Sequence, residues 1–391
     1  MSEPDAFTFM AVGDVNIQRP DPFGLFGDTL GVLGQADMLV GNLEGVVSDL
    51  GVPLSGKREA GSSCVRGSVG SVAAIAEVGF SAMSMANNHG MDFGAEALDH
   101  SLKLLHESGI ATAGAGPTLA VARAPAIMTR GGVRIAMLAY TSVFPVFGFA
   151  ATPDGPGVAV IRVSTAYETP ANVPYQPGTP ATTITIPNEA DRGAMEEDVR
   201  LARLDADLVV VQFHWGVVGM SRPLGYMREL GRSAIDAGAD LVLGNHAHVL
   251  QGIEFYREGL ICYSLNHFAF EHIGHIFPAW PFVHDTVIFT AVVENGGFAR
   301  PSLVAATLDP ITHDLALASE RRRTEVADYL TGLSAEFGTA VDVAGDRLVI
   351  RPPAEPVTPK RAPEVYRDPS SAVLDAQGVL ARAEQARTSA L

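Results

Sequence analysis

Side chains able to bind a metal follow five short apolar runs of the chain, close to the point where each run ends. Acidic residues come after the first two runs, an Asn-Asn-His sequence after the third, and histidines after the last two. Such runs indicate buried strands, and the carboxyl ends of parallel strands form the sheet edge where sites are built. We therefore expect one cluster at that edge, made of Asp14, Glu44, Asn88, His214, His246 and His248.

The cluster mixes nitrogen and oxygen donors, and this mixture indicates which ions it suits. Zn, Fe and Mn accept imidazole together with carboxylate, whereas Ca and Mg prefer sites built mostly of oxygen. Two ions about 3.5–4 Å apart can share such a set. His246 and His248 are two residues apart, so on an extended segment both side chains would face the same way.

Each of these features also has an ordinary structural interpretation. An Asp after a strand commonly forms a turn or caps a helix, and Asn87-Asn88 alone is typical of a turn. A single histidine is more often structural than a ligand. The metal site is favoured because all of these residues follow predicted strands.

Apolar runs alternate with helical stretches, which predicts a layered α/β fold. The predicted helices are Ala95–Ser108, Met195–Leu204 and Leu224–Ala237. The predicted strands are Phe7–Val12, Asp37–Val40, Ser81–Met85, Val133–Tyr140, Leu208–Phe213, Leu241–Leu243, Leu260–Leu265 and Thr286–Val293.

We assign residues 1–319 to one domain that carries the metal site. Within it, residues 144–190 are rich in Pro, Gly and Thr, so we expect a loop-rich insertion over the site. Residues 320–391 form a C-terminal helical and extended appendage, with a helix at Glu320–Phe337, a strand at Arg347–Arg351 and a short helix at Val373–Ala386.

The composition excludes several classes of protein. Of 391 residues, 44 are acidic and 27 basic, giving a net charge of −17, which opposes binding to nucleic acid or anionic membranes. Two cysteines cannot form a disulfide framework. Because we find no signal peptide and no long apolar run, we expect a cytoplasmic protein without a membrane span.

In their order along the chain, these motifs resemble the CapA (poly-γ-glutamate synthesis protein) family of the calcineurin-like metallophosphoesterase superfamily. The resemblance covers roughly residues 7–295 and is specific for the family, not for a substrate. The motifs that carry it are Gly13-Asp14, Asn42-Leu43-Glu44, Ala86-Asn87-Asn88-His89, His214-Trp215-Gly216 and Gly244-Asn245-His246-Ala247-His248-Val249.

This resemblance implies a four-layer α/β/β/α sandwich with a dinuclear metal centre, holding two divalent ions of Mn, Fe or Zn. It implies that Asp14 and His248 bind the first ion and that Glu44 bridges the two. The second ion would be bound by Asn88, His214 and His246, and His89 would be the catalytic histidine.

The chain departs from the superfamily at Asn16, where a histidine is usual. Asn16 either binds the first ion through its amide oxygen or holds a water. Members linked to capsules often carry an N-terminal signal or anchor, which we do not find. A repurposed soluble enzyme is therefore expected rather than a capsule-building one.

Further residues are assigned to catalysis or to substrate. We expect Asp92 to orient His89, and His267 to contact substrate or act as a second general acid, unless it lines an interface. Arg58, Arg66 and Arg222 are predicted to bind an anionic substrate group, the alternative being ordinary solvated loops. Lys57 lies beside Arg58 and shares both interpretations.

The predicted function is metal-dependent hydrolysis of a small molecule or short polymer. Phosphoester cleavage follows from the superfamily, and cleavage of a γ-glutamyl-like amide follows from the family's association with poly-γ-glutamate. The alternatives are a non-catalytic protein that binds a polymer or metabolite, and a metal-assisted lyase or isomerase. A homodimer is compatible with the composition, and no nucleic-acid or membrane partner is expected.

Overall fold

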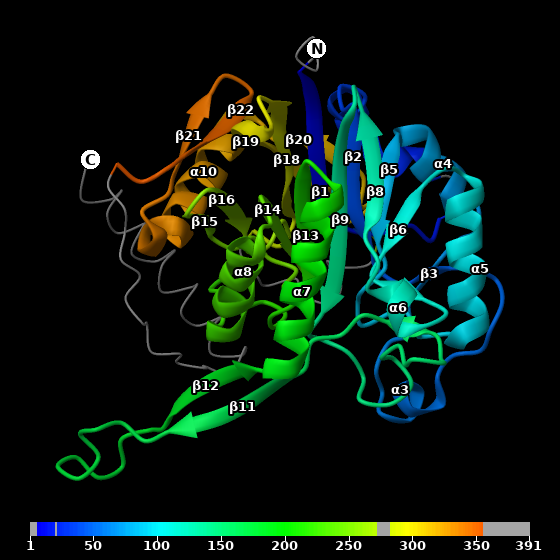
Figure 1. The fold of residues 1–391 in the computed structure, drawn as a ribbon. Helices are drawn as coiled ribbons and strands as arrows, with labels where there is room; N and C mark the ends of the chain where they lie inside the picture. The colour runs from blue at the N-terminus through cyan, green and yellow to red at the C-terminus, as the bar shows by residue number, and fades with distance from the viewer. Residues whose placement is uncertain (1–5, 20–21, 272–281, 355–391) are drawn as a thin grey trace.

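The computed structural model of the chain describes residues 6–19, 22–271 and 282–354. These residues form two large sheets and three two-stranded sheets, with helices between the strands (Figure 1). The predicted α/β fold is confirmed. Among the described helices, none combines the length and the apolar character that crossing a bilayer requires.

The larger sheet contains ten strands in the order β21-β22-β19-β18-β1-β2-β5-β6, with β17 beside β1 and β20 beside β19. Its central strands β1, β2 and β5 run parallel. Their bounds, with those of the other strands of this sheet, are β1 Phe7–Asn16, β2 Met38–Leu43, β5 Phe80–Ser84, β6 Ala111–Ala113, β17 His267–Phe270, β18 Asp285–Glu294, β19 Gly297–Leu308, β20 Leu315–Leu317, β21 Ala340–Ala344 and β22 Arg347–Arg351.

The smaller sheet contains six strands in the order β15-β16-β14-β13-β9-β8. Its central strands β9, β13 and β14 run parallel. The bounds are β8 Ala126–Arg130, β9 Val133–Thr141, β13 Leu208–His214, β14 Leu241–Asn245, β15 Ile253–Tyr256 and β16 Gly259–Cys262. The short strands β3 Val46–Val47, β4 Arg66–Gly67, β7 Ala115–Gly116 and β10 Gly157–Val158 pair outside both large sheets.

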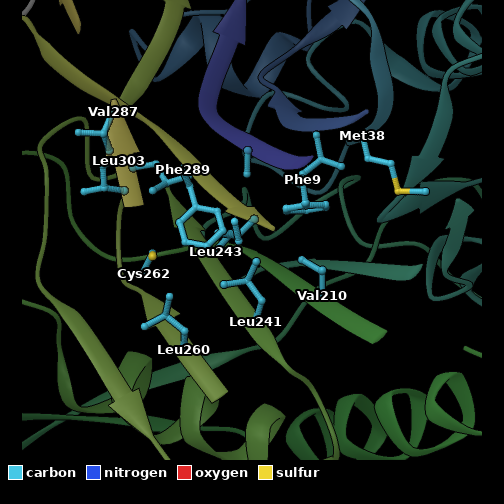
Figure 2. Close-up of a cluster of buried hydrophobic side chains, with 14 of the residues drawn as sticks. Phe9, Met38, Val210, Leu241, Leu243, Leu260, Cys262, Val287, Phe289 and Leu303 are labelled. Carbon is cyan, nitrogen blue, oxygen red and sulfur yellow. The ribbon is translucent and has the colours of Figure 1, made fainter. Parts of the chain in front are cut away.

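One buried cluster joins the two large sheets. Phe9 of β1 and Phe289 of β18 belong to it together with Val210 of β13 and Leu243 of β14 (Figure 2). The sequence of β13 shows why one face of the sheet packs in this cluster, because the side chains of a strand alternate between the two faces. Leu208 and Val210 pack in the cluster between the sheets, whereas Val209 and Val211 pack in a different cluster, with helices.

Helices pack against the other face of each sheet. On the larger sheet, Ile75 of α4 (Ser71–Val78) and Leu98 of α5 (Gly94–Glu107) share a cluster with strand residues. On the smaller sheet, α7 (Glu189–Asp205) and α8 (Gly225–Ala237) do the same. The shorter helices are α1 Phe23–Phe26, η1 Gly27–Thr29, α2 Leu30–Leu33, α3 Ser55–Glu59 and α6 Leu119–Ala122.

Residues 163–187 contain a hairpin that the prediction of a loop-rich insertion did not include. β11 (Val163–Glu168) pairs with β12 (Thr182–Pro187) along its whole length, and the hairpin projects away from the body of the protein (Figure 1). β12 is rich in Thr and Ile, which favour strands, and this signal was overlooked beside the many prolines.

The described part of the C-terminal segment packs into the main core. α10 (Glu320–Ser334) is followed by η2 (Ala335–Phe337), and β22 pairs with both β21 and β19. Leu330 and Leu348 belong to the cluster between the sheets. Residues 320–351 thus share the core of residues 1–319, and the helix predicted at 373–386 lies outside the described residues.

Candidate metal centre

Strands from both large sheets end at one place and carry the predicted donors there. Asp14 lies near the end of β1 and Glu44 directly follows β2. His214 ends β13, and His246 directly follows β14. Asn88, in the loop after β5, reaches the same place, because its Oδ1 lies 2.7 Å from Nε2 of His214. The structure therefore brings together residues that are far apart in the sequence.

Glu44 lies at the middle of this cluster. Within the described residues, donor atoms of Asp14, Glu44 and His214 lie within 4.8 Å of one another, and so do those of Glu44, His246 and His248. Glu44 is the member common to both groups. A carboxylate has two oxygens, so this position suits a ligand that bridges two ions.

The Glu44 carboxylate lacks a partner that would compensate its charge. Both oxygens are buried, and neither has a hydrogen-bond partner within the described part of the chain. The side chains of His89 and His214 come to 3.7 and 3.8 Å from Oε1. Burial and the neighbouring Asp14 raise the pKa of Glu44 well above its usual range. A bound cation would remove this penalty, because a buried, uncompensated charge is costly.

Asp14 is held in a fixed orientation by two donors. Its Oδ1 accepts a hydrogen bond of 2.7 Å from the Asn42 amide, and its Oδ2 accepts one of 3.1 Å from the His246 backbone N–H. Burial nevertheless raises the pKa of Asp14 to about 7. Without a cation, this carboxyl is therefore partly protonated near neutral pH.

The three histidines of the cluster are buried and neutral. Burial lowers the pKa of His246 to about 3, and it lowers the pKa of His214 and His248 well below the usual range. Ring centroids are 4.6 Å apart for His214 and His246, and 6.0 Å for His246 and His248. Neutral imidazole is the form that binds metal ions.

The backbone around His246 and His248 differs from our expectation. These residues have φ of 85° and 50°, so the segment is not extended and that reasoning was wrong. Such conformations are unfavourable for residues other than glycine and cost about 1–3 kcal/mol each. They persist where the surrounding structure holds them, and here they place both rings near Glu44.

Two asparagines that the sequence analysis did not assign support the centre. The Asn42 amide donates to Asp14 and lies 3.3 Å from Nδ1 of His214. The Asn87 amide donates to the Leu43 carbonyl, and its Oδ1 accepts the backbone N–H of His89 at 3.1 Å. Asn42 lies near the end of β2 and Asn87 follows β5, as the donors lie near the ends of their strands. Their position relative to strands could therefore have identified them from the sequence.

Both polar atoms of the Asn16 side chain form hydrogen bonds within the chain. Its amide nitrogen donates to the Glu44 backbone carbonyl at 2.7 Å, and its Oδ1 accepts a bond of 2.8 Å from Gln18. These contacts fix the loop that carries Glu44. A role of Asn16 as a metal ligand stays a prediction.

His89, Asp92 and Lys57 form a connected group beside Glu44. Nδ1 of His89 lies 2.6 Å from Oδ2 of Asp92, and Nε2 lies 3.7 Å from Oε1 of Glu44. The Lys57 ammonium forms an ion pair with Asp92 and lies 3.2 Å from Nδ1 of His89. Burial lowers the pKa of His89, and the bond to Asp92 opposes this change. Sequence reasoning did not connect Lys57 with His89, since their contact depends on the tertiary fold.

The remaining predicted residues lie outside this group. Arg58 and Arg222 are exposed, and the guanidinium of Arg66 lies 3.5 Å from the centroid of the Phe93 ring. The roles of these three arginines toward substrate stay predictions. His267 is fully buried, with its ring centroid 5.7 Å from that of His248.

The donor set fits divalent transition ions. Carboxylate oxygens and neutral imidazole nitrogens converge, and an unpartnered buried carboxylate lies among them. The described residues thus define an α/β protein with buried His, Asp and Glu groups that could bind metal.

Comparison with known proteins gives the family. Residues 8–272 match the model described as bacterial capsule synthesis protein PGA_cap. The chain belongs to this CapA family, which lies within the metallophosphoesterase-like superfamily. The resemblance seen in the motifs is confirmed.

Three relatives illustrate the match. The capsule biosynthesis protein CapA of Bacillus anthracis is 27% identical over 315 residues, which cover 76% of this chain and 66% of the relative. The PGA biosynthesis protein CapA of Bacillus subtilis (strain 168) is 31% identical over 231 residues, covering 59% and 51%. A probable polyglutamine synthesis accessory protein of Mycobacterium tuberculosis is 27% identical over 293 residues, covering 71% and 68%. The matches thus span between about half and two thirds of the two Bacillus proteins.

Proposed function

We propose that this protein is a metal-dependent hydrolase whose centre holds two divalent ions of Mn, Fe or Zn. The observation that carries the proposal is the buried Glu44 carboxylate, which lacks a hydrogen-bond partner in the described chain and is common to both donor groups. Asp14 and the three histidines complete those groups, and Asn88 adds an amide oxygen beside His214. When bound, the ions supply a water of lowered pKa and polarise the bond to be cleaved.

His89 is proposed as the residue that moves a proton. Its Nε2 lies on the side of Glu44, and its Nδ1 is bonded to Asp92. Asp92 fixes the orientation of the ring and stabilises the imidazolium that forms when Nε2 carries a proton. Nε2 then donates that proton to the leaving group. Burial of the surrounding side chains excludes water and strengthens these interactions.

The substrate is proposed to be a small molecule or short polymer with a phosphoester or a γ-glutamyl-like amide. Membership of the superfamily supports the first bond, and the names of the relatives, which refer to capsule and polyglutamine synthesis, support the second. We also propose that the two sheets and their covering helices follow the four-layer α/β/β/α order of the superfamily. A cytoplasmic location, a homodimer and substrate binding by Arg58, Arg66 and Arg222 remain part of this proposal.

Two chromogenic substrates test the proposal. Metal-loaded protein is assayed with p-nitrophenyl phosphate and with γ-glutamyl-p-nitroanilide, beside the variants Glu44→Gln and Glu59→Gln. Glu59 is an exposed residue at the end of α3 and serves as the matched control. We expect turnover of one substrate that is lost in Glu44→Gln and retained in the control. Metal-loaded, folded protein that cleaves neither would contradict hydrolysis of these two bond types.

A non-catalytic binding protein on the same fold is the second candidate. The hydrogen bonds of Asn16 favour this candidate. Both polar atoms of the Asn16 side chain bond to other residues of the chain, although Asn16 was predicted to be a metal ligand. The relatives carry biosynthesis and accessory names, which name no reaction. Binding of γ-glutamyl oligomers without turnover, measured by calorimetry, would support this candidate over the hydrolase.

A further inference from the structure

We propose that His267 is a metal ligand of this centre, beside His248. This goes beyond the role in substrate contact or acid catalysis expected from the sequence, and it rests on the proposed metal centre. Three observations carry it: the position of His267 in the sheet, its lack of polar partners, and the state of Asn16.

The position of His267 is set by the pairing of β17 with β1. The two strands are parallel, and His267 is the register partner of Asp14. Residues paired in this way project to the same face of a sheet, so His267 is directed to the face that Asp14 uses. The strands are close here, since a Cβ on Gly13 would lie 1.7 Å from the Asn266 carbonyl oxygen.

The His267 ring is buried without a polar partner. It is 0% exposed, and neither ring nitrogen makes a hydrogen bond of normal geometry within the described residues. Burial lowers the pKa of His267, and the Val283 backbone opposes this change only weakly. An imidazole fully buried with both nitrogens unsatisfied is costly unless another group uses a nitrogen.

The ring lies beside an established member of the donor cluster. Its centroid is 5.7 Å from that of His248, close to the 6.0 Å between His246 and His248. His248 itself lies 3.8 Å from Asp14. His267 is not in either group of donor atoms within 4.8 Å, so binding requires its side chain to move toward Asp14 and His248.

Asn16 explains why an additional nitrogen ligand is useful at this end of the centre. Its two polar atoms are bonded to Glu44 and Gln18, so the end of β1 presents Asp14 without help from Asn16. Neutral imidazole beside Asp14 and His248 would supply the missing donor. Together with the shared Glu44, the resulting set of two carboxylates and two imidazoles suits Zn, Fe or Mn.

The test measures metal binding rather than activity. Wild type, His267→Asn and His106→Asn are stripped with chelator and titrated with Co²⁺, following bound metal and the visible absorption spectrum. His106 is an exposed histidine of α5 that bonds Thr112, and it is the matched control. We expect His267→Asn to weaken the second equivalent of Co²⁺ at least about tenfold and to change the spectrum. His106→Asn should match the wild type.

X-ray absorption on the Zn-loaded wild type counts the imidazole ligands directly. This measurement does not depend on whether a variant folds. Our proposal predicts one more imidazole ligand than His214, His246 and His248 supply. Unchanged affinity and spectrum in His267→Asn, or only three imidazoles in the wild type, would overturn it. Failure of the wild type itself to bind Co²⁺ would instead overturn the proposed function on which this inference rests.

Discussion

At the scale of single residues, Lys57 makes the least expected contact of the centre. Its side chain is 10% exposed, and its ammonium pairs with Asp92 while lying near Nδ1 of His89. It also donates to the Asn88 backbone carbonyl at 2.9 Å. Lys57 therefore acts through other groups, and we regard it as a positioning residue for His89.

Replacing Lys57 with Met removes this charge while keeping most of the side-chain volume. We expect kcat to fall about 10- to 100-fold, since Asp92 and His89 lose the cation that fixes them, while metal content stays unchanged. Lys103→Met is the control, because Lys103 is 67% exposed on α5. Steady-state kinetics and elemental analysis check both. Loss of metal in Lys57→Met with the fold retained would show that Lys57 supports the ligands instead.

The carboxyl of Asp14 predicts how metal affinity depends on pH. Its pKa is raised from 3.8 to about 7 by burial, so the metal-free protein holds a proton there below pH 7. A cation displaces that proton, so affinity should rise by at least about tenfold per pH unit between pH 5 and 7. His246, with a pKa near 3, adds no dependence in this range.

Calorimetry in two buffers of different ionisation enthalpy counts the protons released. We expect about one proton per chain to be released from Asp14 at pH 6, with Glu44 contributing as well. An affinity independent of pH from 5 to 7 would mean that Asp14 is already ionised without metal.

At the scale of elements, the strand ends build the centre, whereas the β11–β12 hairpin stands apart from it. Within the described residues, β11 and β12 pair with each other and with no further strand, and near the base of the hairpin Thr185 Oγ1 accepts the Tyr226 backbone N–H of α8. Tyr175 at its tip is 91% exposed. The outer hairpin therefore contributes little to the core.

Replacing residues 168–182 with Asn-Gly should leave the fold and the centre intact. Tyr167 and Thr183 face each other in the register, so a two-residue turn can join them. We expect metal content to be unchanged and the melting temperature to shift by no more than a few degrees. A loss of bound metal in the shortened chain would show that this element acts on the centre after all.

The strands that carry the donors could be predicted from the sequence, because apolar runs and the polar residues near their ends are local signals. Phe7, Val133 and Leu208 begin strands where the prediction placed them. Contacts between elements could not be predicted in this way. The approach of Lys57 to His89 and the turned backbone at His246 depend on how separate strands and loops pack.

At the scale of the whole molecule, the C-terminal segment completes one core. The sequence suggested an appendage after residue 319, because the composition changes there. In the structure α10 packs its apolar side chains between the sheets, and Leu330 is 1% exposed. Composition indicates which residues face solvent, but it does not show which few side chains pack in a core formed by residues far away in the sequence.

Leu330→Ala tests whether residues 320–351 belong to the same cooperative unit. We expect the free energy of unfolding to fall by about 2–5 kcal/mol, the usual cost of emptying a buried leucine site. Leu204→Ala is the control, because Leu204 is 81% exposed on α7 and should change stability by less than about 0.5 kcal/mol. Chemical denaturation followed by tryptophan fluorescence gives both values. Equal stability of the two variants would show that the segment is a separate appendage.

The number of metal ions bound per chain tests the central claim most directly. Protein stripped with chelator, reloaded with Mn, Fe or Zn and freed of excess metal is analysed for its metal content, beside Glu44→Gln. We predict about two ions per wild-type chain and fewer in Glu44→Gln, because Glu44 is the carboxylate common to both donor groups. A wild-type chain that retains none of these ions, or a Glu44→Gln variant that retains the same number with the same affinity, would contradict the account.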